Sequence, residues 1–146
     1  MQTIHDIMTR DVLSIAPADT VRRAAELMDE LNIGAIPVCE GDKLVGMITD
    51  RDITVRSTAA GQPPETTHVA DVMSADVRTC FSHQTVDEVL GQMGEVQIRR
   101  MPVLDKNGAL VGIVSLGDMA TKHSAGIDRA LEEISEPSEP DRPQTH

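Results

Sequence analysis

Apolar residues follow a helical period at two places in the chain, and the second place repeats the first. The first series contains Val21, Ala24, Ala25, Met28 and Leu31, and the second contains Val86, Val89, Leu90, Met93 and Val96. Steps of three and four residues put such a series on one face of a helix. Because both copies agree on this period, the pattern predicts amphipathic helices over residues 21–31 and 86–96.

Shorter apolar runs flank each of these helices. They lie at residues 12–16, 35–39 and 44–48 in the first copy and at 77–81, 101–104 and 110–114 in the second. The last two runs are joined through Asn107-Gly108, and Asn-Gly between apolar runs is a strong signal for a β-hairpin. Each copy is therefore predicted to fold as β-α-β-β-α.

Capping signals mark the ends of the predicted helices. Thr85 with Glu88 has the pattern of a capping box at the start of helix 86–96. Gly61 and Gly126 stand where C-terminal caps belong. A second helix in each copy is therefore expected to run to about residue 60 or 125.

These elements predict a mixed α/β (α+β) fold, in which two repeats pack with pseudo-two-fold symmetry into one module. The expected boundaries are residues 4–60 for the first repeat, 61–68 for a linker, 69–125 for the second repeat and 126–146 for the tail. Within the tail, a short helix is expected at 127–134. Residues 135–146 are expected to be disordered, because they hold prolines and charges and nothing apolar to bury.

Composition disfavours several classes of function. The chain of 146 residues has a formal net charge of −11, and Phe81 is its only aromatic residue. Acidic chains are poor partners for nucleic-acid phosphates and anionic membranes, and single-stranded nucleic acid usually needs aromatic stacking. The sequence has two cysteines, no signal-peptide pattern and no long apolar run. We therefore expect a cytoplasmic protein with no disulfide framework that binds neither nucleic acid nor membrane.

The clearest repeated motif is a heptad at residues 46–52 and again at 112–118. Each copy puts a hydroxyl three residues before a carboxylate, Thr49 before Asp52 and Ser115 before Asp118. Such a pair can be a capping box that only starts a helix. It also suits a ribose-phosphate, because a helix N-terminus attracts phosphate, a hydroxyl donates to it and a carboxylate accepts from two sugar hydroxyls. The residues alone leave both interpretations open.

The repeat resembles a tandem pair of CBS domains, named after cystathionine β-synthase. The β-α-β-β-α unit, the Pro-Val strands and the two Gly-x-x-Thr/Ser-x-x-Asp endings carry the resemblance over about residues 4–125. It implies two clefts between the repeats that bind an adenosine-containing ligand such as AMP, ADP, ATP, NAD or S-adenosylmethionine. It also implies a flat, disc-like homodimer.

The resemblance assigns roles to particular residues. Asp52 and Asp118 match ribose-binding carboxylates, and Thr49 and Ser115 match hydroxyls that hold phosphate or ribose. Residues that match the lining of the adenine are Val12, Leu13, Ile36, Pro37, Val77, Met101 and Pro102. Arg100 matches a phosphate-contacting arginine, and the first copy has Ala35 at that place, so one nucleotide is expected, with room for a second. Arg51 lies only in the first heptad and suits either a phosphate contact or a solvated helix position.

Three hypotheses of function remain. The leading one is a regulatory module that senses adenine nucleotides and signals to a separate, unidentified effector protein. The second is a ligand-free structural module for dimerisation or protein interaction, whose hydroxyl–acid pairs are only helix caps. The third is a thiol redox response through Cys39 or Cys80. The sequence offers no catalytic set and no zinc-ligand spacing, so we expect neither an enzyme nor a metal site.

Overall fold

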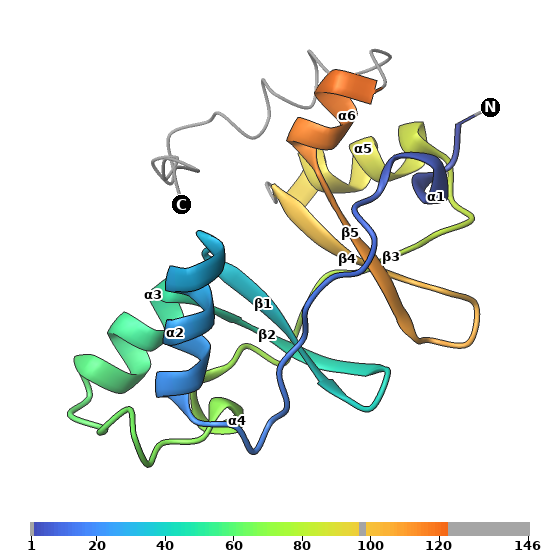
Figure 1. The fold of residues 1–146 in the computed structure, drawn as a ribbon. Coiled ribbons are helices and arrows are strands. Elements are labelled where there is room, and N and C mark those ends of the chain that lie inside the picture. The colour runs from blue at the N-terminus through green and yellow to red at the C-terminus, as the bar shows by residue number, and fades with distance from the viewer. Residues whose placement is uncertain (1, 97–98, 123–146) are drawn as a thin grey trace. The chain divides into compact units, whose positions relative to one another are not determined.

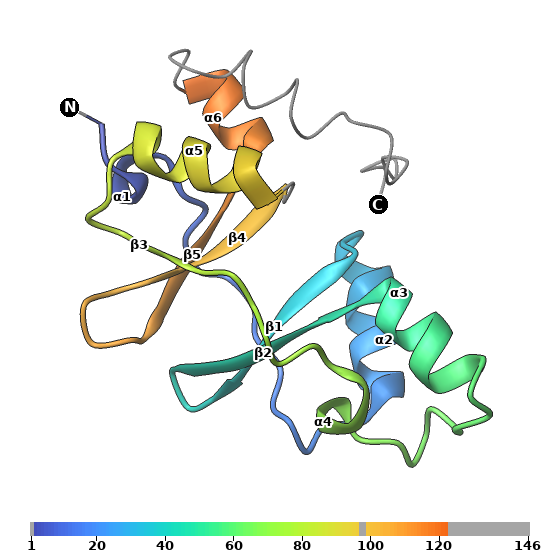
Figure 2. The ribbon, with the colours of Figure 1, turned by 180° about the vertical axis from the view of Figure 1, so that it is seen from behind.

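The computed structural model describes residues 2–96 and 99–122, and the chain divides into two compact units. The contiguous unit is formed by residues 13–77. The composite unit joins residues 2–12 to the segment that begins at residue 78. Figures 1 and 2 show α1 grouped with α5 and α6, and α4 grouped with α2 and the hairpin of β1 and β2.

The contiguous unit is a β-hairpin covered by helices. Its elements are α2 (Val21–Leu31), β1 (Ala35–Glu40), β2 (Lys43–Thr49), α3 (Asp50–Asp52), the π-helix η1 (Ile53–Thr58) and α4 (Val69–Val72). Strands β1 and β2 pair antiparallel, with a register shift between Val38 and Cys39. Apolar side chains from α2, both strands and α4 form one buried core.

The composite unit repeats this plan with one additional strand. Its elements are α1 (Ile4–Ile7), β3 (Cys80–Phe81), α5 (Val86–Val96), β4 (Arg100–Leu104), β5 (Leu110–Ser115) and α6 (Leu116–Lys122). Strand β4 pairs antiparallel with β5 and parallel with the two-residue β3. At the hairpin turn the carboxylate of Asp105 accepts from the amides of Asn107 and Ala109, and Gly108 has a φ of 87°. The predicted hairpin is confirmed.

The two repeats exchange their opening segments. Helix α1, at the start of the first repeat, buries Ile4 and Ile7 in the core of the composite unit. Helix α4, at the start of the second repeat, buries Val69 and Val72 in the core of the contiguous unit. Each compact unit therefore combines the opening of one repeat with the helices and hairpin of the other, so the units and the sequence repeats have different boundaries.

The expected elements differ from the structure in three details. The extended stretches are short, because β3 has only two residues and Ile15 makes a single bridge to Val38. On α2, Leu27 is buried while Ala25 lies outside the buried arc and Leu31, the last helical residue, is 49% exposed. The second helix of the first copy is a short α3 that continues as a π-helix and ends before Gly61, whose φ is +75°.

Several sequence-based expectations fall on the remaining part of the chain. Gly126, the short helix at 127–134 and the tail at 135–146 lie outside the described residues. Among the described residues no helix is long and apolar enough to cross a membrane.

Candidate functional site

Both repeated hydroxyl–acid pairs form complete capping boxes. The Thr49 amide donates to the Asp52 carboxylate at 3.0 Å, and the Asp52 amide donates to the Thr49 hydroxyl at 3.1 Å. Ser115 and Asp118 repeat this arrangement at 3.0 and 3.1 Å. In each box the hydroxyl serves as acceptor, which leaves its own proton to donate, and the bond uses one of the two carboxylate oxygens. Capping alone therefore does not use the full hydrogen-bonding capacity of either pair.

A backbone segment from the opposite repeat crosses the hairpin next to each box. In the contiguous unit Ser74 exchanges two backbone hydrogen bonds with Met47, at 2.8 and 2.9 Å. In the composite unit Thr9 exchanges two with Ile113, at 2.9 and 3.0 Å. We call residues 72–74 and 7–9 the crossing segments. They lie at equivalent places, beside the hairpin strand that leads into each box.

The glycines that open the heptads make this crossing possible. A Cβ atom on Gly46 would lie 2.8 Å from the Ser74 carbonyl oxygen, and one on Gly112 would lie 2.7 Å from that of Thr9. Real Cβ atoms do not approach a backbone oxygen so closely. The structure thus brings the backbone of the crossing segment close to each heptad glycine.

The contiguous unit links its crossing segment directly to the carboxylate. The Ser74 hydroxyl donates to Oδ1 of Asp52 at 3.4 Å, while Oδ2 of Asp52 accepts from the Thr49 amide. Oδ1 therefore faces a polar group and points away from the helix cap. Thr9, which stands at the corresponding place in the composite unit, is exposed.

Arginine distinguishes the two boxes. Arg100 pairs across the hairpin with Ser115, whereas Ala35 pairs with Thr49. The chain enters the following helix alike in both units, since the Leu116 amide donates to the Arg99 carbonyl and the Asp50 amide donates to the Gly34 carbonyl. The composite unit thus carries a half-buried cation opposite its hydroxyl, while Arg51 lies exposed on α3 of the contiguous unit.

The residues expected to line an adenine divide between the units. Leu13, Ile36, Pro37 and Val77 belong to the contiguous unit, and Val12, Met101 and Pro102 belong to the composite unit. The Ile36 and Met101 side chains lie in the two cores, and both prolines are buried. Val12 and Val77 are half-buried, and Leu13 is 42% exposed. Leu13 is therefore the most accessible apolar side chain of this set.

Both cysteines are buried. Burial raises the pKa of the Cys80 thiol to about 12. Burial also raises the pKa of Cys39, against the lowering effect of a hydrogen bond with Ser14. A reactive cysteine needs an accessible thiolate. These environments therefore disfavour the redox hypothesis.

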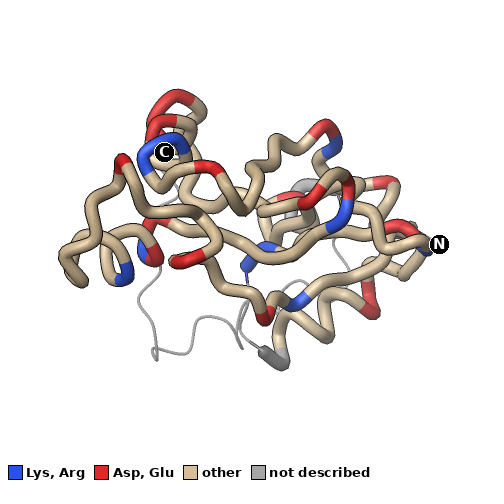
Figure 3. The backbone as a smooth tube through the Cα atoms, turned by 90° about the horizontal axis from the view of Figure 1, so that it is seen from below, with Lys and Arg blue, Asp and Glu red and all other residues tan. Residues whose placement is uncertain are grey.

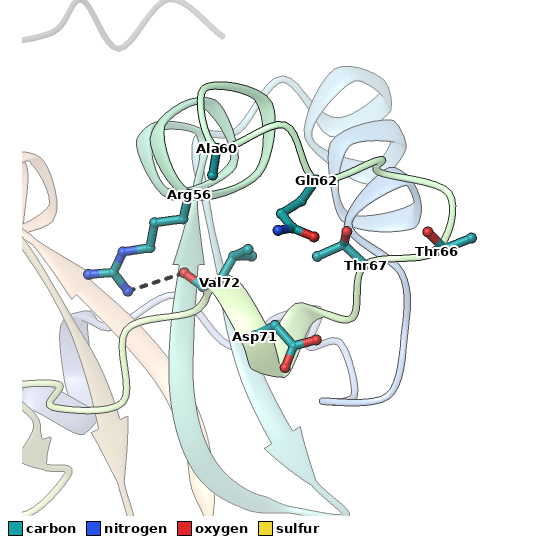
Figure 4. Close-up of a pocket in the computed structure, with 7 residues that line it drawn as sticks. All are labelled: Arg56, Ala60, Gln62, Thr66, Thr67, Asp71 and Val72. Atoms are coloured by element: carbon teal, nitrogen blue, oxygen red, sulfur yellow. Dashed lines mark hydrogen bonds between the residues drawn. The ribbon is translucent and has the colours of Figure 1, made fainter.

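A polar cavity of about 390 Å³ lies between η1, the loop after it and α4 of the contiguous unit. It is lined by Arg56, Ala60, Gln62, Thr66, Thr67, Asp71 and Val72 (Figure 4). Arg56 donates to the carbonyls of Val72 at 3.3 Å and of Met73 at 3.1 Å. One wall of this cavity is therefore tied to the crossing segment.

Charge is distributed over both units. Figure 3 shows Asp and Glu positions along the whole described backbone, with fewer Lys and Arg between them. In the described ranges no three His, Cys, Asp or Glu side chains lie together in a way that could hold a metal ion.

Sequence reasoning did not name Ser74 or Arg56 as site residues. The signal for Ser74 was present, because Met8-Thr9 and Met73-Ser74 repeat a hydroxyl after a methionine at the expected offset. The signal for Arg56 was only a shared positive charge, since Lys122 stands at the corresponding place in the second copy.

Comparison with known proteins agrees with this architecture. The CBS domain family model matches residues 4–57 and 69–124. The CBS domain-containing protein YhcV of Bacillus subtilis is 42% identical over 139 residues, which cover 92% of this chain and 96% of YhcV.

Two solved structures extend the comparison. Hypoxic Response Protein I, crystallised with two coordinated zinc ions, is similar with a TM-score of 0.76 and 36% identity, over 84% of this chain and 100% of that one. The CBS domain pair of protein MJ0100, in complex with 5′-methylthioadenosine and S-adenosyl-L-methionine, has a TM-score of 0.71 and 26% identity, over 84% and 100% of the two chains. The present chain belongs to the CBS domain family and carries two CBS domains in tandem.

Proposed function

We propose that this protein is a regulatory module that binds adenosine-containing ligands and signals to a separate effector protein. Asp52 and Asp118 accept from the ribose hydroxyls, and Thr49 and Ser115 donate to ribose or phosphate. Arg100 contacts the phosphate of an AMP-, ADP- or ATP-type ligand at the composite unit. The protein acts through a change of state on binding, which requires the ligand to prefer one state.

The observation that carries this proposal is the hydrogen bond from Ser74 to Oδ1 of Asp52. A carboxylate that served only as a cap needs one oxygen, and here the second oxygen faces a hydroxyl from a segment remote in sequence. A sugar hydroxyl offers the same donor chemistry as the Ser74 hydroxyl. The Asp52 box is therefore suited to accept ribose in addition to starting a helix, and we extend this role to the matching Asp118 box.

The ligand class is supported by a relative. The CBS pair of MJ0100 holds 5′-methylthioadenosine and S-adenosyl-L-methionine, and both contain adenosine. For the present chain we propose recognition of the adenosine moiety and not of one particular ligand. AMP, ADP, ATP, NAD and S-adenosylmethionine all present that moiety.

Titration calorimetry on nucleotide-free protein tests the proposal. AMP, ADP, ATP, NAD and S-adenosylmethionine should be tested separately, with inosine monophosphate as a control that lacks the adenine amino group. We expect saturable heat with at least one adenosine ligand and weaker binding of the inosine compound. Absence of heat with all five adenosine ligands would remove the sensor function.

Matched cap variants separate ligand binding from helix capping. Asp118→Ala removes a capping box and the proposed ribose contact, whereas Glu88→Ala removes only the Thr85–Glu88 box of α5. We expect D118A to weaken nucleotide binding at least tenfold while losing about 1 kcal/mol of stability, the usual cost of a lost cap. E88A is expected to lower the melting temperature and to leave the affinity unchanged.

A ligand-free dimerisation module is the second candidate, and the closed capping boxes favour it. Leu31 on α2 and Val55 on η1 are 49% and 50% exposed, so the contiguous unit presents apolar side chains on its helices. Replacing both residues with Ser would convert a dimer to a monomer if this surface joins two copies. Light scattering distinguishes the outcomes, and unchanged mass would remove these side chains from the interface.

A further inference from the structure

The end of helix α4 is held by a side chain from a different element. Arg56, on η1, uses Nη1 to donate to the carbonyls of Val72 and Met73, at 3.3 and 3.1 Å. These carbonyls belong to the last residue of α4 and to its C-cap. A helix leaves its last carbonyls without internal donors, and a cation at that end satisfies them. Arg56 therefore joins η1 to the crossing segment.

This attachment lies next to the proposed ribose contact. Met73 precedes Ser74, which exchanges backbone bonds with Met47 and donates its hydroxyl to Asp52. The Met73 sulfur lies 2.9 Å from the place that a Cβ on Gly46 would occupy. A small displacement of residues 73–74 would therefore alter both the Asp52 contact and the packing on Gly46.

The cavity explains why a side chain is needed to hold the carbonyls at the end of α4. Val72 packs inward with 1% exposure, but the space between α4, η1 and the loop after it is a polar cavity of about 390 Å³. In Figure 4 the Arg56 side chain extends from η1 to the Val72 carbonyl beside this cavity. The core fixes the inward face of α4, while Arg56 fixes the carbonyls at its end.

The composite unit shows a different arginine contact at its opening helix. There Arg10, next to Thr9, donates to the His5 carbonyl of α1 at 3.1 Å, so both groups lie within one short segment. The Arg56 bonds join residues 16 and 17 positions apart in the sequence. In the contiguous unit, Arg56 thus links η1 to the crossing segment over a long separation in sequence.

We propose that Arg56 is a positioning residue of the ligand site in the contiguous unit. It holds the crossing segment so that Ser74 stays against Asp52 and beside Gly46. This role rests on the proposed function, because it predicts that Arg56 sets ligand affinity at the Asp52 site without touching the ligand. It also predicts a local effect that needs no ligand, which allows the two ideas to be tested separately.

Amide hydrogen exchange tests the positioning role in the free protein. In Arg56→Met, the Met47 and Ser74 amides should exchange about ten times faster than in the wild type, because loss of charged hydrogen bonds raises local opening. The Thr9 and Ile113 amides serve as an internal control and should keep their rates. Arg22→Met removes the same charge from an exposed site on α2 and should change none of the four rates. Wild-type rates at Met47 and Ser74 in R56M would overturn the proposal.

Ligand affinity gives the second readout. In a D118A background only the Asp52 site remains, and adding R56M should raise the AMP Kd about five- to tenfold. In a D52A background R56M should leave the Kd unchanged. In the D118A background Arg56→Lys should retain part of the affinity that R56M loses. An equal loss in both backgrounds would show a general structural effect and overturn the positioning role. Failure of D118A itself to bind would count against the ligand site at Asp52, and the exchange rates would still decide the role of Arg56.

Discussion

The two units build one plan with different polar groups. In both, a hydroxyl–acid box starts a helix, a crossing segment pairs beside it and a glycine provides the space. The composite unit adds Arg100 opposite Ser115, and the contiguous unit adds the Ser74–Asp52 bond and the Arg56 link. The shared parts are those that the fold requires. The parts that differ bear charge or donate hydrogen bonds, which are the properties that distinguish one ligand from another.

The helices after the boxes differ too. α3 continues as the π-helix η1, whereas α6 is α-helical from Leu116 to Lys122. A π-helix closes i→i+5 hydrogen bonds, so each turn holds more residues than in an α-helix, and it frequently marks functional sites. Here it carries Arg56, whose guanidinium reaches the crossing segment. Duplication therefore preserved the start of each helix and let its continuation diverge.

Substitution of the crossing glycines is expected to give the largest effect and tests what the units share. Gly46→Ala and Gly112→Ala should each lower the free energy of unfolding by about 1–3 kcal/mol, because the new Cβ meets a backbone oxygen that cannot move freely. Gly91→Ala is the matched control, since it lies on α5 with nothing within 4 Å, and should be stabilising. Denaturant unfolding measures all three. A neutral G46A or G112A would contradict the close crossing in that unit.

Removal of Arg100 sharpens the difference between the units. Arg100→Ala should weaken AMP binding about tenfold through loss of a charge-assisted bond, and it should change adenosine binding little because adenosine has no phosphate. Arg78→Ala removes a charge from an exposed position of the same unit and is the control. Calorimetric titrations with both ligands compare the loss of affinity for AMP with the loss for adenosine. Equal losses for AMP and adenosine would separate Arg100 from the phosphate.

The two thiols give the smallest expected difference. Cys80 of the composite unit has its pKa raised from 9.0 to about 12, while the hydrogen bond with Ser14 opposes the rise at Cys39. Maleimide labelling of native protein at pH 8 should therefore modify Cys39 faster than Cys80, with both labelled alike after unfolding. A raised thiol pKa also favours the folded state below pH 9.0, and that contribution should be lost as pH rises toward 12. Faster labelling of Cys80 would contradict the prediction that Cys39 is the more reactive thiol.

Much of this architecture follows from the sequence, because duplication tests each pattern twice. The helices at 21–31 and 86–96, the hairpins and the capping boxes depend on local periodicity and local hydrogen bonds, and all are confirmed. The short helices α1 and α4 were missed, although Thr3 with Asp6 forms a capping box of the same kind. Four residues are too few for a periodic signal.

The sequence pattern did not contain the long-range placement of α1 and α4. That α1 packs with the second hairpin and α4 with the first depends on pairings such as Thr9 with Ile113. A repeat is equally compatible with each copy folding on itself. The link from Arg56 was hidden for the same reason, since it joins segments that no local rule connects.

AMP titration of Asp52→Ala and Asp118→Ala side by side tests the central claim most directly. The two carboxylates hold identical positions in their boxes, so both variants lose the same cap, and D52A also loses the Ser74 contact. Because Arg100 lies opposite Ser115, D118A should lose the tighter AMP site and D52A should retain it. A D118A protein that binds AMP as tightly as the wild type would contradict the account.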